Sequence, residues 1–289
     1  MFCSENFSSE VSPAGRWDCK TCVEAHSDRV LVNDARVLEN LLLSEHSVKI
    51  TDYCHRNQTN IKPHMRKIVT DWMLEVCEDQ HCQSEVFFLA VNYLDRFLSL
   101  VNIRKTQFQL VASVCILLAS KFSQVVPVSS EQLVIYTDNS VCLEELKEWE
   151  LFLLSVLQWE LSSATAHSFI QHFCQRIHCD SHVRRQAETI ATLANTEYEF
   201  ILTKQSVIAA ASLAAALKEE LDSSEEVLNL LKNVASNMKT DLNEILVCMY
   251  HIIHLRCQPH QSQEKQSKVE ERPNTPDDVL NISQNEIIV

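Results

Sequence analysis

The side chains with the most chemical potential in this chain are its twelve cysteines and twelve histidines. Cys19 and Cys22 have the Cys-x-x-Cys spacing of a zinc ligand pair, but no second pair follows at the spacing of a tetrahedral zinc site. Four other cysteines lie inside apolar helical runs, where a thiol behaves as a small hydrophobic side chain: Cys77, Cys115, Cys174 and Cys248. We therefore predict no metal site and reduced thiols in an intracellular protein.

The motifs of common enzymes are absent from the sequence. The only glycine is Gly15, which rules out a glycine-rich loop around a phosphate, and there is no His-Glu-x-x-His string or nucleophile motif. His167, His172 and His178 have the spacing of side chains along an ordinary helix. We predict that the protein is not an enzyme and binds no cofactor.

One modification motif stands near the C-terminus. In the string RPNTPDDV, Thr275 precedes Pro276, which is the minimal target of a proline-directed kinase. Phosphorylation there would add nearly two negative charges to an acidic segment and favour a basic receptor pocket.

Composition limits the classes to which the protein can belong. Of its 289 residues, 46% are apolar and only one is glycine, so we predict an all-α protein without the tight turns of a sheet. The net charge of −14 and the lack of a Lys/Arg cluster exclude nucleic acid and anionic membrane as expected partners. The first ten residues do not have the pattern of a signal peptide, and no apolar run reaches the length of about 18 residues that spans a membrane.

Apolar periodicity divides the chain into two sets of five helices. We predict that residues 1–27 are flexible and that a helix capped by Asn33 or Asp34 follows them. In the first set of helices, Pro63 begins one helix and Ser84 caps the next. The third helix of this set, residues 105–122, is apolar nearly all round. A second set begins at the N-cap Thr165, and its third helix, residues 205–218, is again apolar all round.

The equal rank of the two apolar helices indicates an internal duplication. Each unit is expected to wrap four helices around a buried central one. The alternative is a single irregular α-domain with a chance likeness. The predicted domains are 28–160, which includes the preceding helix, and 161–256, followed by a disordered acidic tail over 257–289.

The helix with the sequence MRKIVTDWMLEV, residues 65–76, has two apolar stripes where a surface helix usually has one. One stripe consists of Met65, Ile68, Val69 and Trp72, and the other continues through Met73, Val76 and Cys77. Periodicity alone does not say which stripe faces water, and the first stripe could equally belong to the core.

This helix resembles the first long helix of the cyclin box. NYLDRFLS (92–99) and LLASKF (117–122) are similar to the next two helices of that box, and IYTDNS (135–140) and WEL (149–151) fall where its fourth and fifth helices belong. These forms resemble D-type cyclins in particular, over about residues 28–256. The resemblance implies a non-enzymatic subunit that binds and activates a G1 cyclin-dependent kinase, recruits substrates, promotes the G1/S transition, and is found in the nucleus and cytoplasm.

By this resemblance, the kinase contact centres on Lys121 and Glu150. The first ends the buried third helix and the second lies on the fifth. The residues by themselves allow a simpler interpretation, in which Lys121 only caps a helix C-terminus, where a cation is favoured.

The resemblance also implies an exposed groove that binds Leu-containing basic motifs of inhibitors and substrates. The matching positions are Met65, Ile68, Val69, Trp72, Glu75 and Gln109. The apolar side chains would form the groove, Glu75 would attract the cation of the motif, and Gln109 would bind its backbone.

Two departures from the D-type pattern alter the expected partners. D-type cyclins commonly carry Leu-x-Cys-x-Glu, which docks retinoblastoma-family proteins, but here Lys20 precedes Cys22 and Glu24 in place of the leucine. We expect these proteins as substrates, with weak or absent docking through this element, because a leucine contributes about 2 kcal/mol on burial. Ser123 and Gln124 also replace a common acidic pair after Phe122.

Two rival functions remain at this point. A transcription-type cyclin-box protein would need a basic face, which the net charge opposes. An orphan cyclin would bind as a scaffold without activating a kinase.

Overall fold

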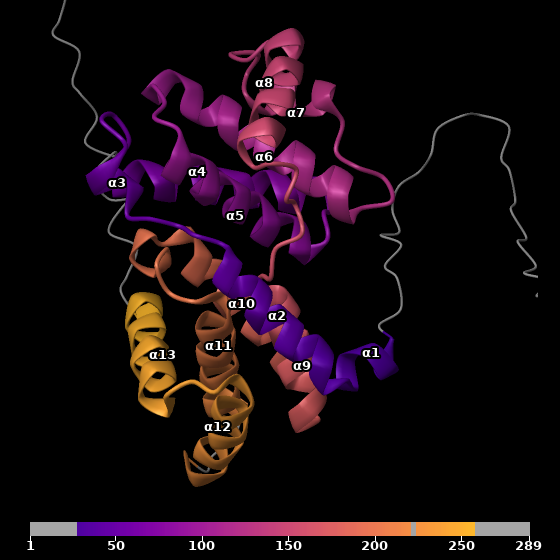
Figure 1. Ribbon diagram of the computed structural model, residues 1–289, viewed down its shortest axis with the longest axis vertical. Helices are drawn as coiled ribbons and strands as arrows, with labels where there is room; N and C mark the ends of the chain where they lie inside the picture. The colour runs from indigo at the N-terminus through magenta and orange to yellow at the C-terminus, as the bar shows by residue number, and fades with distance from the viewer. Residues whose placement is uncertain (1–27, 221–223, 258–289) are drawn as a thin grey trace, which may run out of the picture.

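The computed structural model describes residues 28–220 and 224–257. Within these ranges every regular element is an α-helix or a short 3₁₀-helix, as the scarcity of glycine predicted. The helices form two bundles stacked along the long axis of the molecule (Figure 1).

The first bundle surrounds one buried helix. Its five long elements are α4 (Pro63–Asp79), α5 (Ser84–Leu100), α6 (Phe108–Ser123), α7 (Ser130–Tyr136) and α8 (Leu143–Val156). Helix α6 contacts all four others, and every residue from Leu110 to Ser120 is buried. A 3₁₀ turn, η1 (Lys105–Gln107), leads into it.

The second bundle repeats this plan. Its helices are α9 (Ala166–Ile177), α10 (Ser181–Thr196), α11 (Gln205–Glu220), α12 (Ser224–Met238) and α13 (Leu242–Cys257), with the 3₁₀ turn η2 (Tyr198–Phe200) before α11. Helix α11 is buried from Ser206 to Leu217 and contacts the other four. The predicted arrangement of four helices around a central one is therefore confirmed in both units.

Local capping accounts for the helix starts. The Thr165 side chain accepts from the Ser168 N–H at the start of α9, and Pro63 occupies the first turn of α4, both as predicted. The predicted N-cap Ser84 is off by one residue, since Gln83 precedes the helix and Ser84 is its first residue.

The N-terminal helices lie on the second bundle, although they precede the first in sequence. Asp34 caps α2 (Ala35–Ser47), as expected, and also separates it from the short α1 (Arg29–Asn33), which the sequence analysis did not foresee. Helix α2 crosses α9 and α11 (Figure 1). At this crossing the Glu45 carboxylate accepts two hydrogen bonds of 2.7 Å, from the N–H and the hydroxyl of Ser206.

By length and composition alone, the helical segment Lys105–Ser123 is apolar enough to cross a membrane. Its 18-residue window is 67% buried inside the protein, as expected for the central helix of a bundle.

Candidate functional site

Lys121 and Glu150 form an ion pair on the surface of the first bundle. The Lys121 Nζ lies 2.6 Å from the Glu150 Oε1, and the two side chains are 44% and 16% exposed. Lys121 stands in the last turn of α6 and Glu150 in the middle of α8, so packing of α8 on the central helix brings them together. Lys121 is also the basic residue in the last turn of α6, a position that suits the helix-capping interpretation as well.

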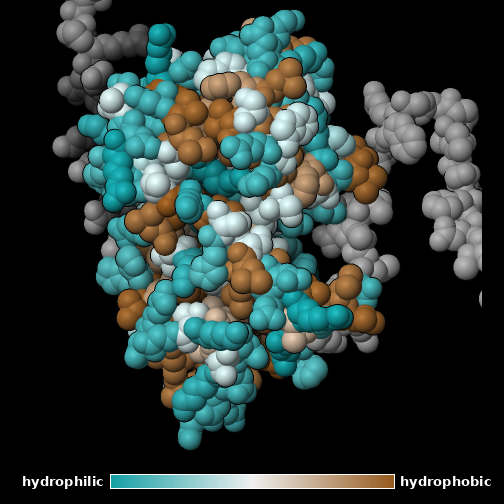
Figure 2. All heavy atoms as spheres, in the orientation of Figure 1, coloured by the Kyte–Doolittle hydropathy of each residue, from teal (hydrophilic) through white to brown (hydrophobic). Residues whose placement is uncertain are grey.

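Exposed apolar residues are adjacent in sequence to both members of this pair. Phe122 follows the lysine, and Leu151 and Phe152 follow the glutamate, all without full burial. Val125 and Val126, in the connection after α6, are exposed as well. Figure 2 shows hydrophobic patches among hydrophilic ones over the first bundle. Charged groups amid exposed apolar residues are typical of surfaces that bind a protein partner.

The α8 side of this face is held by aromatic contacts. Trp149 packs edge-on against Phe152 with ring centroids 5.4 Å apart, and both rings contact the buried Phe97 of α5. This cluster fixes the segment of α8 that carries Glu150.

The two stripes of α4 have different environments. Met73, Val76 and Cys77 are buried in the core, as predicted. Ile68 is 65% exposed, whereas the predicted groove residues Met65, Val69 and Trp72 are half-buried and pack against the core with their inner sides. Glu75 is exposed on the same helix, and Gln109 is half-buried at the start of α6, which contacts α4.

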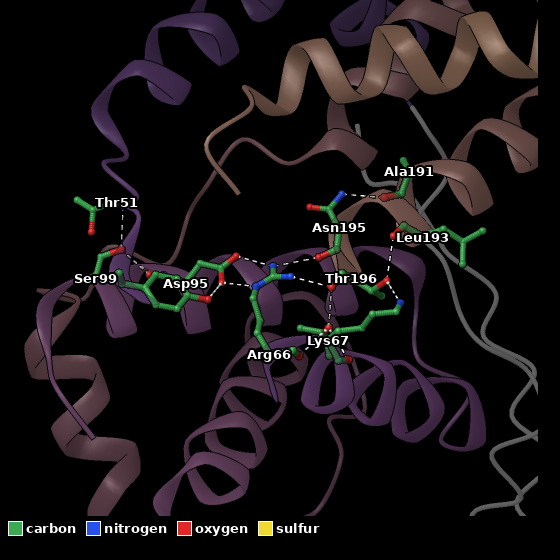
Figure 3. A network of polar contacts seen from close by, with 11 residues as sticks. Thr51, Arg66, Lys67, Asp95, Ser99, Ala191, Leu193, Asn195 and Thr196 are labelled. Atoms are coloured by element: carbon green, nitrogen blue, oxygen red, sulfur yellow. Dashed lines mark hydrogen bonds and ion pairs between the residues drawn. The ribbon is translucent and has the colours of Figure 1, made fainter. Parts of the chain in front are cut away.

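A buried ionic network that the sequence did not reveal joins α4 to α5 and to the end of α10 (Figure 3). Arg66 Nε and Nη2 donate to the two oxygens of Asp95 over 2.9 and 2.8 Å, and the Tyr53 hydroxyl donates to Asp95 Oδ1 over 2.8 Å. The same guanidinium donates to the backbone carbonyls of Asn195 and Thr196 at the end of α10. Helices α4 and α5 of the first bundle are thereby joined to the second bundle.

The electrostatics of this network follow from its burial. Burial opposes the charge of Arg66, but the Asp95 carboxylate offsets it, so the pKa of Arg66 lies above its ordinary value. Burial and the same carboxylate raise the pKa of Tyr53 well above its usual range and keep it protonated. The sequence signal that could have revealed the network is the position of Arg66, one turn before Thr70 and two turns before Met73 on the inner side of α4.

The remaining predicted positions lie outside the described residues: Cys19, Cys22, Glu24 and Thr275. In residues 28–220 and 224–257, no group of three or more His, Cys, Asp or Glu side chains is placed to hold a metal ion.

Comparison with known proteins agrees with this architecture. Residues 36–162 match the family described as "Cyclin, N-terminal domain", and residues 164–284 match "Cyclin, C-terminal domain". A viral cyclin from herpesvirus saimiri has the same fold, with a TM-score of 0.68 at 24% identity over 75% of this chain and 95% of that chain.

Two relatives are similar over nearly their whole length. The G1/S-specific cyclin-D2 of Xenopus laevis is 38% identical over 91% of this chain and 97% of the relative. The G1/S-specific cyclin-D1 of Danio rerio is 41% identical over 91% and 96%, respectively. The chain therefore belongs to the cyclin family and, within it, to the D-type cyclins that are specific to the G1/S step.

Proposed function

We propose that this D-type cyclin, a regulatory subunit of a cyclin-dependent kinase at the G1/S step, activates its kinase through the face around Lys121 and Glu150. The observation that carries the proposal is the 2.6 Å ion pair between α6 and α8 beside exposed Phe122, Leu151 and Phe152. The preferred partner is proposed to be a kinase of the G1 type.

Activation would follow from a shift between two kinase conformations. Kinases transfer phosphate only when a Lys–Glu pair forms, with the glutamate on their C-helix. A partner that contacts the active position of this helix more favourably than the inactive one shifts the equilibrium toward activity. The apolar residues would supply contact area, and the ion pair would direct its charged groups at the kinase backbone.

The test is Lys121→Glu, which places two carboxylates side by side on the proposed face. We expect the purified variant to fold, because Lys121 is 44% exposed, and to stimulate the G1 kinase at least ten-fold less than wild type. Lys232→Glu, at an exposed position on α12, makes the same charge change on the other bundle and should activate normally. Equal activation by wild type and Lys121→Glu would refute the proposal, and kinase binding without activation by wild type would favour a scaffold.

A second surface is proposed to recruit inhibitors and substrates that carry Leu-containing basic motifs. It consists of Met65, Ile68, Val69, Trp72, Glu75 and Gln109, hereafter the docking stripe. Its support is the exposure of Ile68 and the incomplete burial of Met65 and Trp72 on a helix whose other stripe is core. An apolar stripe beside Glu75 suits a motif that combines leucine with a cation.

Retinoblastoma-family proteins are proposed as substrates that do not depend on the degenerate motif around Cys22 and Glu24. With Lys20 in place of leucine, a peptide of residues 16–28 should not bind a pocket domain at micromolar concentration. A micromolar or tighter complex would overturn this.

Thr275 is proposed as a phosphorylation site that controls distribution between nucleus and cytoplasm and protein lifetime. The Thr-Pro context in an acidic segment supports phosphorylation. The role itself is implied by the resemblance to D-type cyclins, in which a phosphorylation site at this position is linked to nuclear export and degradation. Thr275→Ala should lengthen the lifetime and increase the nuclear fraction in cycling cells, and unchanged values would contradict the role.

A further inference from the structure

The same six-residue pattern ends the first helix of both bundles. Residues 77–82 read CEDQHC at the end of α4, and residues 174–179 read CQRIHC at the end of α9. Both follow Cys-x-x-x-His-Cys. The two helices hold equivalent positions in the duplicated units, so the two cysteine pairs stand at equivalent places in the fold.

The backbone closes each pattern with a left-handed turn. The Cys82 N–H donates to the Cys77 carbonyl over 2.8 Å, and the His81 N–H donates to Glu78 over 3.0 Å. His81 has a φ of 51°, which completes a Schellman motif. A side-chain contact between the first and sixth residues frequently accompanies this motif, and here both residues are cysteines.

The second pattern ends in a similar left-handed turn, although here the His178 N–H donates to the Cys174 carbonyl rather than to that of the following residue. The Cys179 N–H donates to the Cys174 carbonyl over 3.1 Å, and His178 has a φ of 52°. In both patterns a histidine, His81 or His178, takes the left-handed conformation that glycine usually adopts, and a cysteine follows it.

Each pair combines one buried and one partly exposed thiol. Cys77 is buried and Cys82 is partly exposed, and the backbone hydrogen bond between these two residues holds them together; the pair Cys174 and Cys179 repeats this arrangement. The neighbouring buried thiol lowers the pKa of Cys82 and of Cys179. This opposes the effect of a helix C-terminus, which disfavours a thiolate.

The first pair is open to small molecules. Cys77 and Cys82 line a cavity of about 390 Å³ between α4, α5 and α10, together with Glu78, Arg185 and Thr189. An oxidant of the size of hydrogen peroxide can therefore reach the outer sulfur.

We propose that each pair is an oxidant-responsive dithiol site, which forms a reversible disulfide within its own turn, Cys77–Cys82 in the first bundle and Cys174–Cys179 in the second. The oxidant is of the peroxide class. The outer thiolate attacks one peroxide oxygen, the O–O bond breaks, and the outer cysteine becomes a sulfenic acid with release of water. The inner thiol then attacks the sulfenic sulfur and releases a second water, so one peroxide oxidises two thiols to one disulfide.

Packing of the turn alone does not require cysteine at both positions. Any two apolar residues satisfy the contact between the ends of a Schellman motif. The bridge requires two cysteines within the Cα separation of about 4.4–6.8 Å that a disulfide spans, and a six-residue turn closed by a backbone hydrogen bond meets this range. In a reducing compartment such a bond is transient, as expected of a redox-responsive site.

Tryptic mapping of the full-length chain after mild peroxide treatment tests the proposal. Cys77 and Cys82 fall in one peptide, 68–96, which should lose two hydrogen atoms. Cleavage at Arg176 separates Cys174 from Cys179, so the second disulfide should appear as peptide 148–176 cross-linked to peptide 177–184. A thiol reductant should reverse both changes.

Single substitutions and an internal comparison complete the test. Cys82→Ser should abolish the first disulfide and leave the second, and Cys179→Ser should do the reverse, with unchanged circular dichroism of the reduced proteins. Cys142 is exposed, and it is the single cysteine of its tryptic peptide, 122–147. This peptide should therefore not lose the two hydrogen atoms that mark an internal disulfide. The proposal would be overturned if Cys82 were oxidised to a sulfinic acid and no disulfide formed. It would also be overturned if Cys142 were oxidised while Cys77 and Cys82 both remained free thiols that an alkylating reagent still modifies.

Discussion

Arg66 and Asp95 form a two-pronged ion pair at the junction of the two bundles, with their side chains only 2% and 5% exposed. Because Arg66 also binds the carbonyls of Asn195 and Thr196, one guanidinium connects α4, α5 and the end of α10 (Figure 3). The proposed docking stripe and the proposed kinase-binding face around Lys121 and Glu150 both lie on the bundle that this network anchors to its neighbour.

The first prediction concerns this pair. Arg66→Met leaves the Asp95 carboxylate buried without its cation, which should lower the free energy of unfolding by about 3–5 kcal/mol. Urea unfolding measures the change. Lys67→Met removes the neighbouring cation, whose pair with Glu197 is more exposed, and should cost about 1 kcal/mol or less. Equal losses for the two variants would contradict the network's role.

The second prediction separates the two stripes of α4 with consecutive residues. Trp72→Ala should weaken binding of a Leu-containing basic peptide at least ten-fold, because Trp72 belongs to the docking stripe. Met73→Ala should leave peptide affinity unchanged but destabilise the fold by about 2–5 kcal/mol, because Met73 is fully buried. Fluorescence anisotropy and urea unfolding give the two measurements. The docking proposal fails if Trp72→Ala and Ile68→Ala both bind the peptide like wild type.

The third prediction concerns the attachment of α2 to the second bundle. Glu45→Gln removes the charge that accepts from the N–H and hydroxyl of Ser206 at the start of α11, at a cost of about 1–2 kcal/mol. Thermal or urea unfolding detects it. Glu39→Gln on the same helix alters only an exposed contact of 3.9 Å with Lys239 and should have little effect. A Glu45→Gln protein as stable as the Glu39→Gln protein would show that the contact contributes nothing.

The fourth prediction concerns acid stability through His167. Burial, helped by Arg184, lowers the pKa of this histidine from 6.5 to about 4. The Glu188 carboxylate lies 3.7 Å from the His167 ring and would favour a protonated imidazole. The same carboxylate lies closer to Arg184, at 3.2 Å, and this cation offsets the effect of Glu188 on His167. The folded state therefore keeps the imidazole neutral, while the unfolded chain binds a proton below pH 6.5.

Between pH 6.5 and about 4 the unfolded state binds more protons, so stability falls as the pH is lowered through this window. His167 should account for a loss of about 2 kcal/mol between about pH 7.5 and pH 5. His167→Gln does not titrate, so its unfolding free energy should change less than that of wild type over the same interval. Identical pH profiles would disprove the lowered pKa.

Helical periodicity was sufficient to predict the architecture. Two sets of five amphipathic stretches, each with a third member apolar all round, predicted two bundles around α6 and α11. Capping chemistry located Pro63 and Thr165 correctly, and Asp34 as one of two candidates, because these signals depend on neighbours within one turn. The same kind of signal placed the cap at Ser84 one residue too late. The resemblance to D-type cyclins, and not the periodicity, supplied Lys121, Glu150 and the docking stripe.

Long-range contacts decided the rest. The sequence could not show that Arg66 finds Asp95 and the end of α10, because the charge of a residue does not identify a partner that lies 29 or 130 positions away. The packing of α2 on the second bundle and the exposure of Ile68 beside the buried Met73 depend on the same kind of information. A helix has a period and therefore has faces, but only the other helices of the folded protein decide which face is covered and which remains available to a partner.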